Sequence, residues 1–118
     1  MAKARQQSTT KDPVFAAIEK HRKAMQEFSQ ALKVVPGTNS PDPKKEDKYG
    51  NRENRATGRL ASTAPTTLHG LLALVTYING VSSGKFRRGR RDNVFDERLY
   101  DVLAGAEKFL AGQIGRAA

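Results

Sequence analysis

A short basic segment is the densest concentration of chemically active side chains in this sequence. Residues 81–91 carry five cations and no acid, in a chain of 118 residues with a formal net charge of +9. Arginine binds phosphate oxygens in a bidentate manner, and cations of either type neutralise a nucleic-acid backbone. These properties define a candidate nucleic-acid site, in which Phe86 could stack on a base. Its residues are Lys85, Phe86, Arg87, Arg88, Arg90 and Arg91.

The surrounding sequence offers a plainer alternative for the same segment. Residues 60–84 contain no Asp, Glu, Lys or Arg, whereas residues 92–118 hold five acids and three bases. Arg90 and Arg91 could pair with Asp92, Asp96 or Glu97, which would leave a solvated basic loop. Charge alone does not separate the two interpretations.

The two histidines are the next candidates for chemistry. A histidine on an apolar helix face can act as a pH switch or a metal ligand, but a metal site needs companion ligands. The spacing of Glu19 and Glu27 keeps them off the helix face that holds His21. We therefore predict that His21 lies at the core edge and is hydrogen-bonded to a neighbouring helix. His69 falls on the least apolar side of its helix, so we expect it to be partly exposed and no metal to be bound.

Motifs for catalysis are missing from the sequence. It has no cysteine, no Gly-x-Ser-x-Gly, no phosphate-binding loop of the Walker type and no His-Glu-x-x-His. The acids at Asp92, Asp96, Glu97 and Asp101 are spaced like the first turns of a helix, where they interact favourably with the helix dipole. We expect no catalytic residues, no cofactor and no small-molecule substrate, and hence a protein that is not an enzyme.

Three segments have the apolar spacing of helices. In residues 12–33, Asp12 is suited to cap the helix and Pro13 to open it. The apolar residues of this segment recur at steps of three and four, so they form one seam that could serve both as core and as an interface with another copy. The seam is Val14, Ile18, His21, Met25, Phe28 and Leu32.

The other two predicted helices are residues 66–80 and 93–114. Thr66 is the expected cap of the former and Gly80 its terminator, while Asp92 or Asn93 caps the latter. The segment 66–80 has no charged residue and must be covered on most sides. Residues 1–11 read as a disordered basic tail and residues 34–63, rich in proline and mixed charge, as a disordered linker. The predicted fold is all-α: one domain over 12–118, a small three-helix bundle with a long middle linker and a basic loop at 81–91.

Two motifs bear a family resemblance. D-P-V-F-A-A-I-E-K-H-R at 12–22 and A-P-T-T-L-H-G at 64–70 are similar to motifs of a set of uncharacterised small α-helical bacterial proteins. Those have a D-P-[IV]-F-A-A-I-E-x-H-R start and a downstream P-T-T-L-x-G helix start. The resemblance implies a small helical protein and no known activity, and it carries over no functional residue.

The predicted function follows from the helices rather than from a catalytic motif. We expect a helical protein–protein interaction module that self-associates as a homodimer, because three short helices make a marginally stable domain on their own. The alternative is a module that binds DNA or RNA through residues 85–91. A membrane contact is disfavoured, and the polar start and the short apolar runs predict a soluble cytoplasmic protein.

Overall fold

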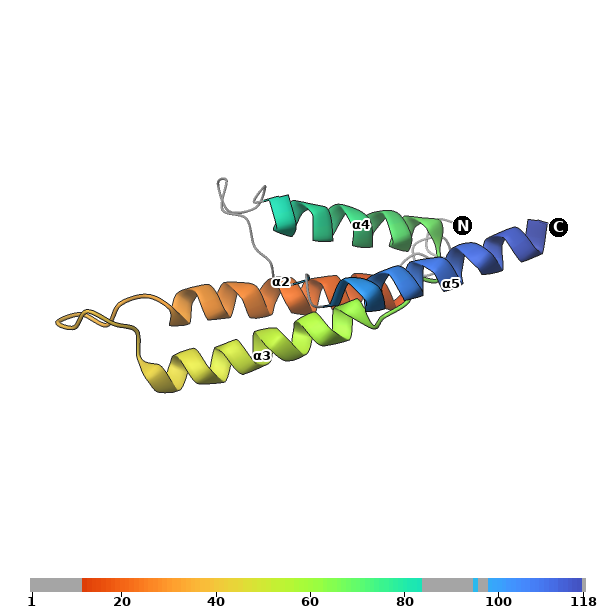
Figure 1. Ribbon diagram of the computed structural model, residues 1–118. Coiled ribbons are helices and arrows are strands. Elements are labelled where there is room, and N and C mark those ends of the chain that lie inside the picture. The colour runs from red at the N-terminus through yellow and green to blue at the C-terminus, as the bar shows by residue number, and fades with distance from the viewer. Residues whose placement is uncertain (1–11, 84–94, 96–97, 118) are drawn as a thin grey trace.

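Four helices account for most of the residues that the structure describes. The computed structural model describes residues 12–83, 95 and 98–117, and no described residue is in a β-strand. The helices are α2 (Pro13–Ala31), α3 (Pro43–Ala61), α4 (Leu68–Ser83) and α5 (Leu99–Ala117). Helices α2 and α3 form an antiparallel hairpin, α4 lies along the first half of α2, and the end of α5 projects past the other helices (Figure 1).

The same local signal opens both helices of the hairpin. An Asp-Pro pair precedes each one, and the aspartate side chain accepts a hydrogen bond from the backbone N–H two residues later, at 3.1 Å for Asp12 and 3.0 Å for Asp42. Proline at the first helical position loses nothing, because that N–H has no partner within the helix. In the turn between the helices, Gly37 has φ +82°, a backbone conformation that favours glycine.

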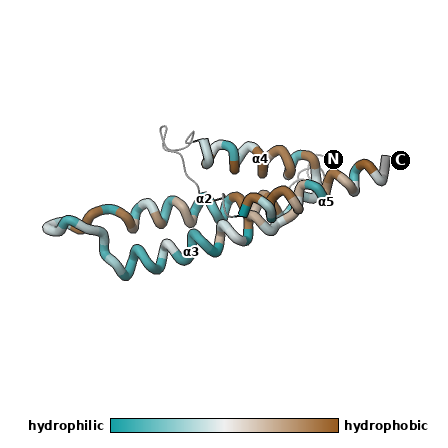
Figure 2. The backbone as a smooth tube through the Cα atoms, in the orientation of Figure 1, coloured by the Kyte–Doolittle hydropathy of each residue, from teal (hydrophilic) through white to brown (hydrophobic). Residues whose placement is uncertain are grey.

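The all-α class is confirmed, but the prediction of three helices is wrong. The predicted linker, residues 34–63, contains α3, whose last turns bury Thr57, Leu60 and Ala61. The composition of this segment suggested disorder because its apolar residues are few. The apolar residues of α3 are concentrated near its C-terminal end, where they meet α2 and the core, and this is enough to fix a helix whose remaining surface is polar (Figure 2).

The helix ends also differ from those predicted. Helix α2 stops at Ala31, two residues early, where the Leu32 N–H bonds back to the Phe28 carbonyl. Helix α4 starts at Leu68 instead of 66 and continues through Gly80, which is buried inside it, to Ser83. Helix α5 starts later than 93 and runs on to Ala117. The predicted caps Asp92 and Asn93, the tail 1–11 and most of the loop 81–91 lie outside the described residues.

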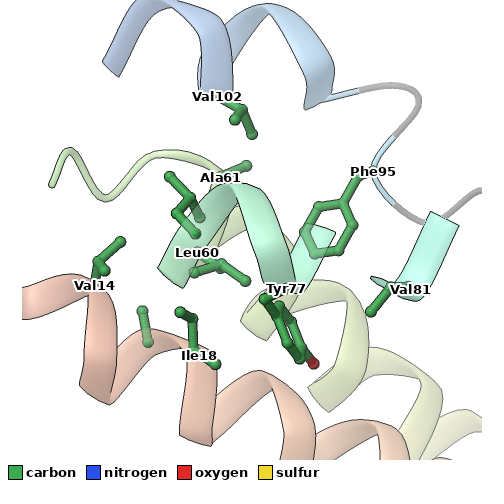
Figure 3. Packing of buried hydrophobic residues seen from close by; sticks show 10 residues of the cluster. Val14, Ile18, Leu60, Ala61, Tyr77, Val81, Phe95 and Val102 are labelled. Carbon is green, nitrogen blue, oxygen red and sulfur yellow. The ribbon is translucent and has the colours of Figure 1, made fainter. Parts of the chain in front are cut away.

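The core is formed by the first turns of α2, the end of α3, the middle and end of α4, and Val102 of α5 (Figure 3). Leu60 and Val14 are completely buried there, and Phe95, which precedes α5, is 2% exposed. Burial of each such side chain stabilises the fold by about 1.5–3 kcal/mol. The cluster comprises Val14, Ala17, Ile18, Leu60, Ala61, Leu74, Tyr77, Val81, Phe95 and Val102.

Substitution of Leu60 tests whether α3 is part of the core. Leu60→Ala removes a fully buried side chain, so we expect the free energy of unfolding to fall by about 2–5 kcal/mol in urea denaturation. The control is Leu32→Ala, at a leucine that is 42% exposed beyond the end of α2, where we expect a change of about 0.5 kcal/mol. If the two variants were equally stable, α3 would not pack as described.

Candidate functional site: the buried histidine and the outer helix faces

Six residues of the basic segment make up the candidate nucleic-acid site. Lys85, Phe86, Arg87, Arg88, Arg90 and Arg91 all lie outside the described residues. The loop they form therefore stays a prediction, as does its pairing with the acids that follow.

The seam of α2 divides into a buried and an open half. Val14, Ile18 and His21 are at most 6% exposed, so they belong to the core of the single chain. Met25 and Phe28 are half-buried, and Leu32 reaches the surface. The prediction of a core face is thus confirmed for the first half of the seam. A role in binding a second copy stays a prediction, and only the second half of the seam is accessible for it.

His21 is the centre of a buried polar network that joins three helices. The hydroxyl of Tyr77 on α4 lies 2.6 Å from Nδ1, and the hydroxyl of Thr57 on α3 lies 3.0 Å from Nε2. Thr57 in turn donates to Glu53 Oε1 at 2.7 Å, and that oxygen is 3.3 Å from His21 Nε2. The prediction of a histidine hydrogen-bonded to a neighbouring helix is confirmed.

The network satisfies both ring nitrogens of His21 at once. If the Thr57 hydroxyl donates to Glu53, the Thr57 oxygen accepts a hydrogen bond from the His21 Nε2–H, and Nδ1 accepts a hydrogen bond from the Tyr77 hydroxyl. Phe95 packs against the imidazole with ring centroids 5.1 Å apart. The ring is 0% exposed and so has no direct access to a substrate in solvent. A buried, fully bonded polar group of this kind fixes how helices register against one another.

A second buried polar group, Asp12, links the starts of α2 and α4. One carboxylate oxygen caps α2, and the other accepts hydrogen bonds from the Thr66 N–H, the Thr67 N–H and the Thr67 hydroxyl, at 2.7–3.1 Å. The Thr67 hydroxyl also accepts from the Gly70 N–H at 2.9 Å, so Thr67, and not Thr66, caps α4. The two motifs of the sequence are therefore in direct contact. Nothing local in the sequence indicated this, because Asp12 and Thr66 lie more than fifty residues apart.

The outer faces of α4 and α5 expose large apolar side chains. On α4, Leu68, Leu72 and Val75 follow one another at steps of four and three and are 53–66% exposed. No described residue covers this face, although the absence of charge in α4 predicted that it would be covered. On α5, the exposed residues Leu99, Leu103, Leu110 and Ile114 also lie along one face. Exposed apolar surface of this extent marks interaction sites in soluble proteins.

Helix α5 is anchored by one side only. Its buried residues are Val102 and Phe109, and near its middle a side chain on Gly105 would touch Ala64. Its last turns extend past the other helices (Figure 1). Its outer face is therefore open along its length. We call the exposed apolar residues of the two helices the α4–α5 outer faces; they are Leu68, Leu72 and Val75 on α4, and Leu99, Leu103, Leu110 and Ile114 on α5.

An open groove of about 870 Å³ lies between α2 and α4. Met25, Tyr77 and Val81 form its apolar floor, and its rim holds one cation, Arg22, and one acid, Glu27. Charge therefore selects no ligand for it.

Among the described residues no group of histidines and acids is arranged to hold a metal, and His69 is exposed. No helix in the described part of the chain is long and apolar enough to cross a bilayer.

Comparison with family models, with curated proteins and with solved structures found no match to this chain.

Proposed function

We propose that this chain is a non-enzymatic, cytoplasmic interaction module that forms a homodimer through the α4–α5 outer faces. The observation that carries the proposal is the row of exposed apolar residues on α4, at 53–66% exposure, in a helix that has no charged residue. A helix without charge is stable in water when most of its sides are covered. A second copy supplies that cover.

The distribution of charge favours a second copy as the partner. Two chains with a net charge of +9 repel each other. Helix α3 has six cations against three acids, whereas α4 has no charge and α5 has two cations and two acids. Of the four described helices, α4 and α5 thus have charges that sum to zero and also have open apolar faces.

The burial of His21 supports a role other than catalysis. Its side chain projects from α2 and is hydrogen-bonded to Thr57 on α3 and Tyr77 on α4, and it is 0% exposed. A general acid or base must come within hydrogen-bonding reach of a substrate. In this position the ring stabilises the fold instead.

Charge inserted into the outer faces should dissociate the dimer. For the double variant Leu72→Lys and Leu110→Lys, sedimentation velocity at micromolar concentration should give a monomer, whereas the unmodified chain gives a dimer. Burial of an unpaired ammonium at each site would weaken association by at least about 3 kcal/mol, more than 100-fold in the dissociation constant.

The chain offers a matched control for this experiment. Leu32 is 42% exposed and Leu110 is 44% exposed, but Leu32 follows the C-terminal end of α2, next to the turn of the α2–α3 hairpin. Leu32→Lys should leave the dimer intact. A monomeric unmodified chain at high micromolar concentration would refute self-association, and dissociation by Leu32→Lys alone would move the interface to the α2 seam.

A further inference from the structure

Five cations form a straight row on the exposed surface of α3. They recur at steps of three, four, three and four residues, which places them on one face of the helix. At a rise of about 1.5 Å per residue the row is about 21 Å long. We call it the α3 basic face; its members, all exposed, are Lys45, Lys48, Arg52, Arg55 and Arg59.

The acids of α3 do not lie on this face. By helical spacing Glu46 and Asp47 fall on other sides of the helix, and Glu53 points inward, where it accepts the Thr57 hydrogen bond. Like charges three and four residues apart repel one another and destabilise an isolated helix. An anionic partner along the row would remove that repulsion.

A shallow groove beside the row widens the basic surface onto α2. This groove, of about 240 Å³, is floored by Ala17, Ala24 and Ala56, whose small side chains let a ligand approach both helices closely. Lys20 of α2 lines it opposite Arg52, Arg55 and Arg59.

One carboxylate lines the same groove. Glu27 Oε2 lies 3.8 Å from Arg52 Nη1. Cations outnumber this acid four to one along the groove, so the site as a whole attracts anions.

The regular spacing of the row indicates a regular polyanion. Three arginines, at 52, 55 and 59, present planar guanidinium groups that bind phosphate in a bidentate manner. A row of about 21 Å spans about six phosphate steps of one strand of a B-DNA duplex, at about 3.4 Å each. A flexible acidic peptide has no such fixed repeat.

A membrane and a single strand fit the surface less well. An amphipathic helix binds a bilayer by inserting its apolar face, but Leu60 and Ala61 of α3 are 0% and 3% exposed inside the core. Single-stranded nucleic acid is held largely by stacking on exposed aromatic rings. The aromatic side chain of α3, Tyr49, is half-buried, and Lys48 and Arg52 each lie about 5.5 Å or less from its ring.

We propose that the α3 basic face, with Lys20, binds the phosphate backbone of double-stranded DNA without reading its sequence. The exposed side of α3 is a convex ridge, and the major groove of B-DNA, about 12 Å wide, can receive such a ridge between its phosphates. The major groove of duplex RNA is too narrow for it. This site shares no residue with the predicted basic loop or with the α4–α5 outer faces.

The test is fluorescence anisotropy of a labelled DNA duplex of about two helical turns, titrated with the full chain at several salt concentrations. The affinity should fall with salt with a logarithmic slope of about −4 to −5, as expected for five or six phosphate contacts that are not all complete. In the variant Arg52→Gln, Arg55→Gln, Arg59→Gln the slope should flatten by about 3 and the affinity should drop about 100-fold or more. Glutamine has nearly the helix propensity of arginine, so the fold should persist, as circular dichroism would verify.

A loop variant serves as the matched control. Arg87→Gln, Arg88→Gln, Arg90→Gln removes the same number of charges from the basic loop, and should weaken binding less than the α3 variant does. An equal or larger loss in the loop variant would overturn the assignment to α3. So would tighter binding to an RNA duplex or a single strand, or binding to anionic vesicles in the absence of duplex binding.

Discussion

Gly70→Ala should destabilise the protein by about 2–4 kcal/mol, although helix propensity alone predicts the opposite sign. Gly70 lies in the first turn of α4, where alanine would normally add up to about 1 kcal/mol of stability. A Cβ at this position would overlap Oδ2 of Asp12, at 1.8 Å. The carboxylate cannot simply swing away, because it is 1% exposed and holds the starts of two helices by four hydrogen bonds. Overpacking and the loss of these bonds both reduce the free energy of unfolding.

Gly112→Ala provides the control for backbone effects. Gly112 is also inside a helix, α5, and an added Cβ there meets no atom within 4 Å. We expect this variant to be stabilised by about 0.5–1 kcal/mol in chemical denaturation. Opposite signs for the two glycines would show that contact with Asp12 decides the outcome at Gly70.

A double-mutant cycle would isolate that contact. In an Asp12→Ala background the space beside Gly70 is free, so Gly70→Ala should cost less by at least about 2 kcal/mol than it does in the unmodified chain. If the two changes were additive within about 0.5 kcal/mol, the Asp12 carboxylate would not be the group that excludes a side chain at Gly70.

The sequence alone was sufficient for helices whose caps and apolar spacing agree. Asp12, Pro13 and the apolar seam predicted α2 to within two residues at its end. Helix α3 begins with the same Asp-Pro signal, at Asp42 and Pro43, but was assigned to a linker. Its periodicity is carried by cations instead of apolar residues, and a search for apolar spacing does not detect a helix of that kind.

The links between helices could not be derived from local patterns. The cap of α2 also binds the start of α4, and the partners of His21 lie on α3 and α4, because the fold brings these segments together. The α3 basic face was within reach of the sequence, since its spacing of three and four is readable once a helix is assumed. The exposure of Leu68 and Leu72 could not be predicted from the sequence, because an uncharged helix is ordinarily covered by other parts of its own chain.

The structure has a basic surface on α3 and apolar surfaces on α4 and α5, which the overall composition does not distinguish. Net charge suggested one basic protein with one basic site. In the described residues the cations of α3 lie on a helix whose inner side packs against α2, whereas the apolar outer faces belong to α4 and α5. The proposed dimer interface and the proposed duplex-binding face are therefore on different helices.

His21→Ala is the substitution in the interior that should cost most, about 3–5 kcal/mol. It removes a 0%-exposed ring that packs on Phe95 and leaves a cavity. It also takes away the hydrogen bond between the Tyr77 hydroxyl and the His21 ring, and the loss of such a bond adds about 0.5–1.5 kcal/mol. Urea denaturation measures the sum. His69→Ala, at the exposed histidine, should change stability by no more than about 0.5 kcal/mol.

Tyr77→Phe separates the polar contribution of the network from its packing. The ring stays, but Nδ1 of His21 loses the hydroxyl at 2.6 Å, so we expect a loss of about 1–3 kcal/mol. The same change at Tyr100, which is 86% exposed, should have almost no effect. If both tyrosine variants were as stable as the unmodified chain, the hydrogen bond between Tyr77 and His21 would contribute little. Packing against Phe95 would then be what holds the His21 ring in place. If only Tyr77→Phe lowered the free energy of unfolding, the hydrogen bond between Tyr77 and His21 would be what ties α4 to the α2–α3 hairpin.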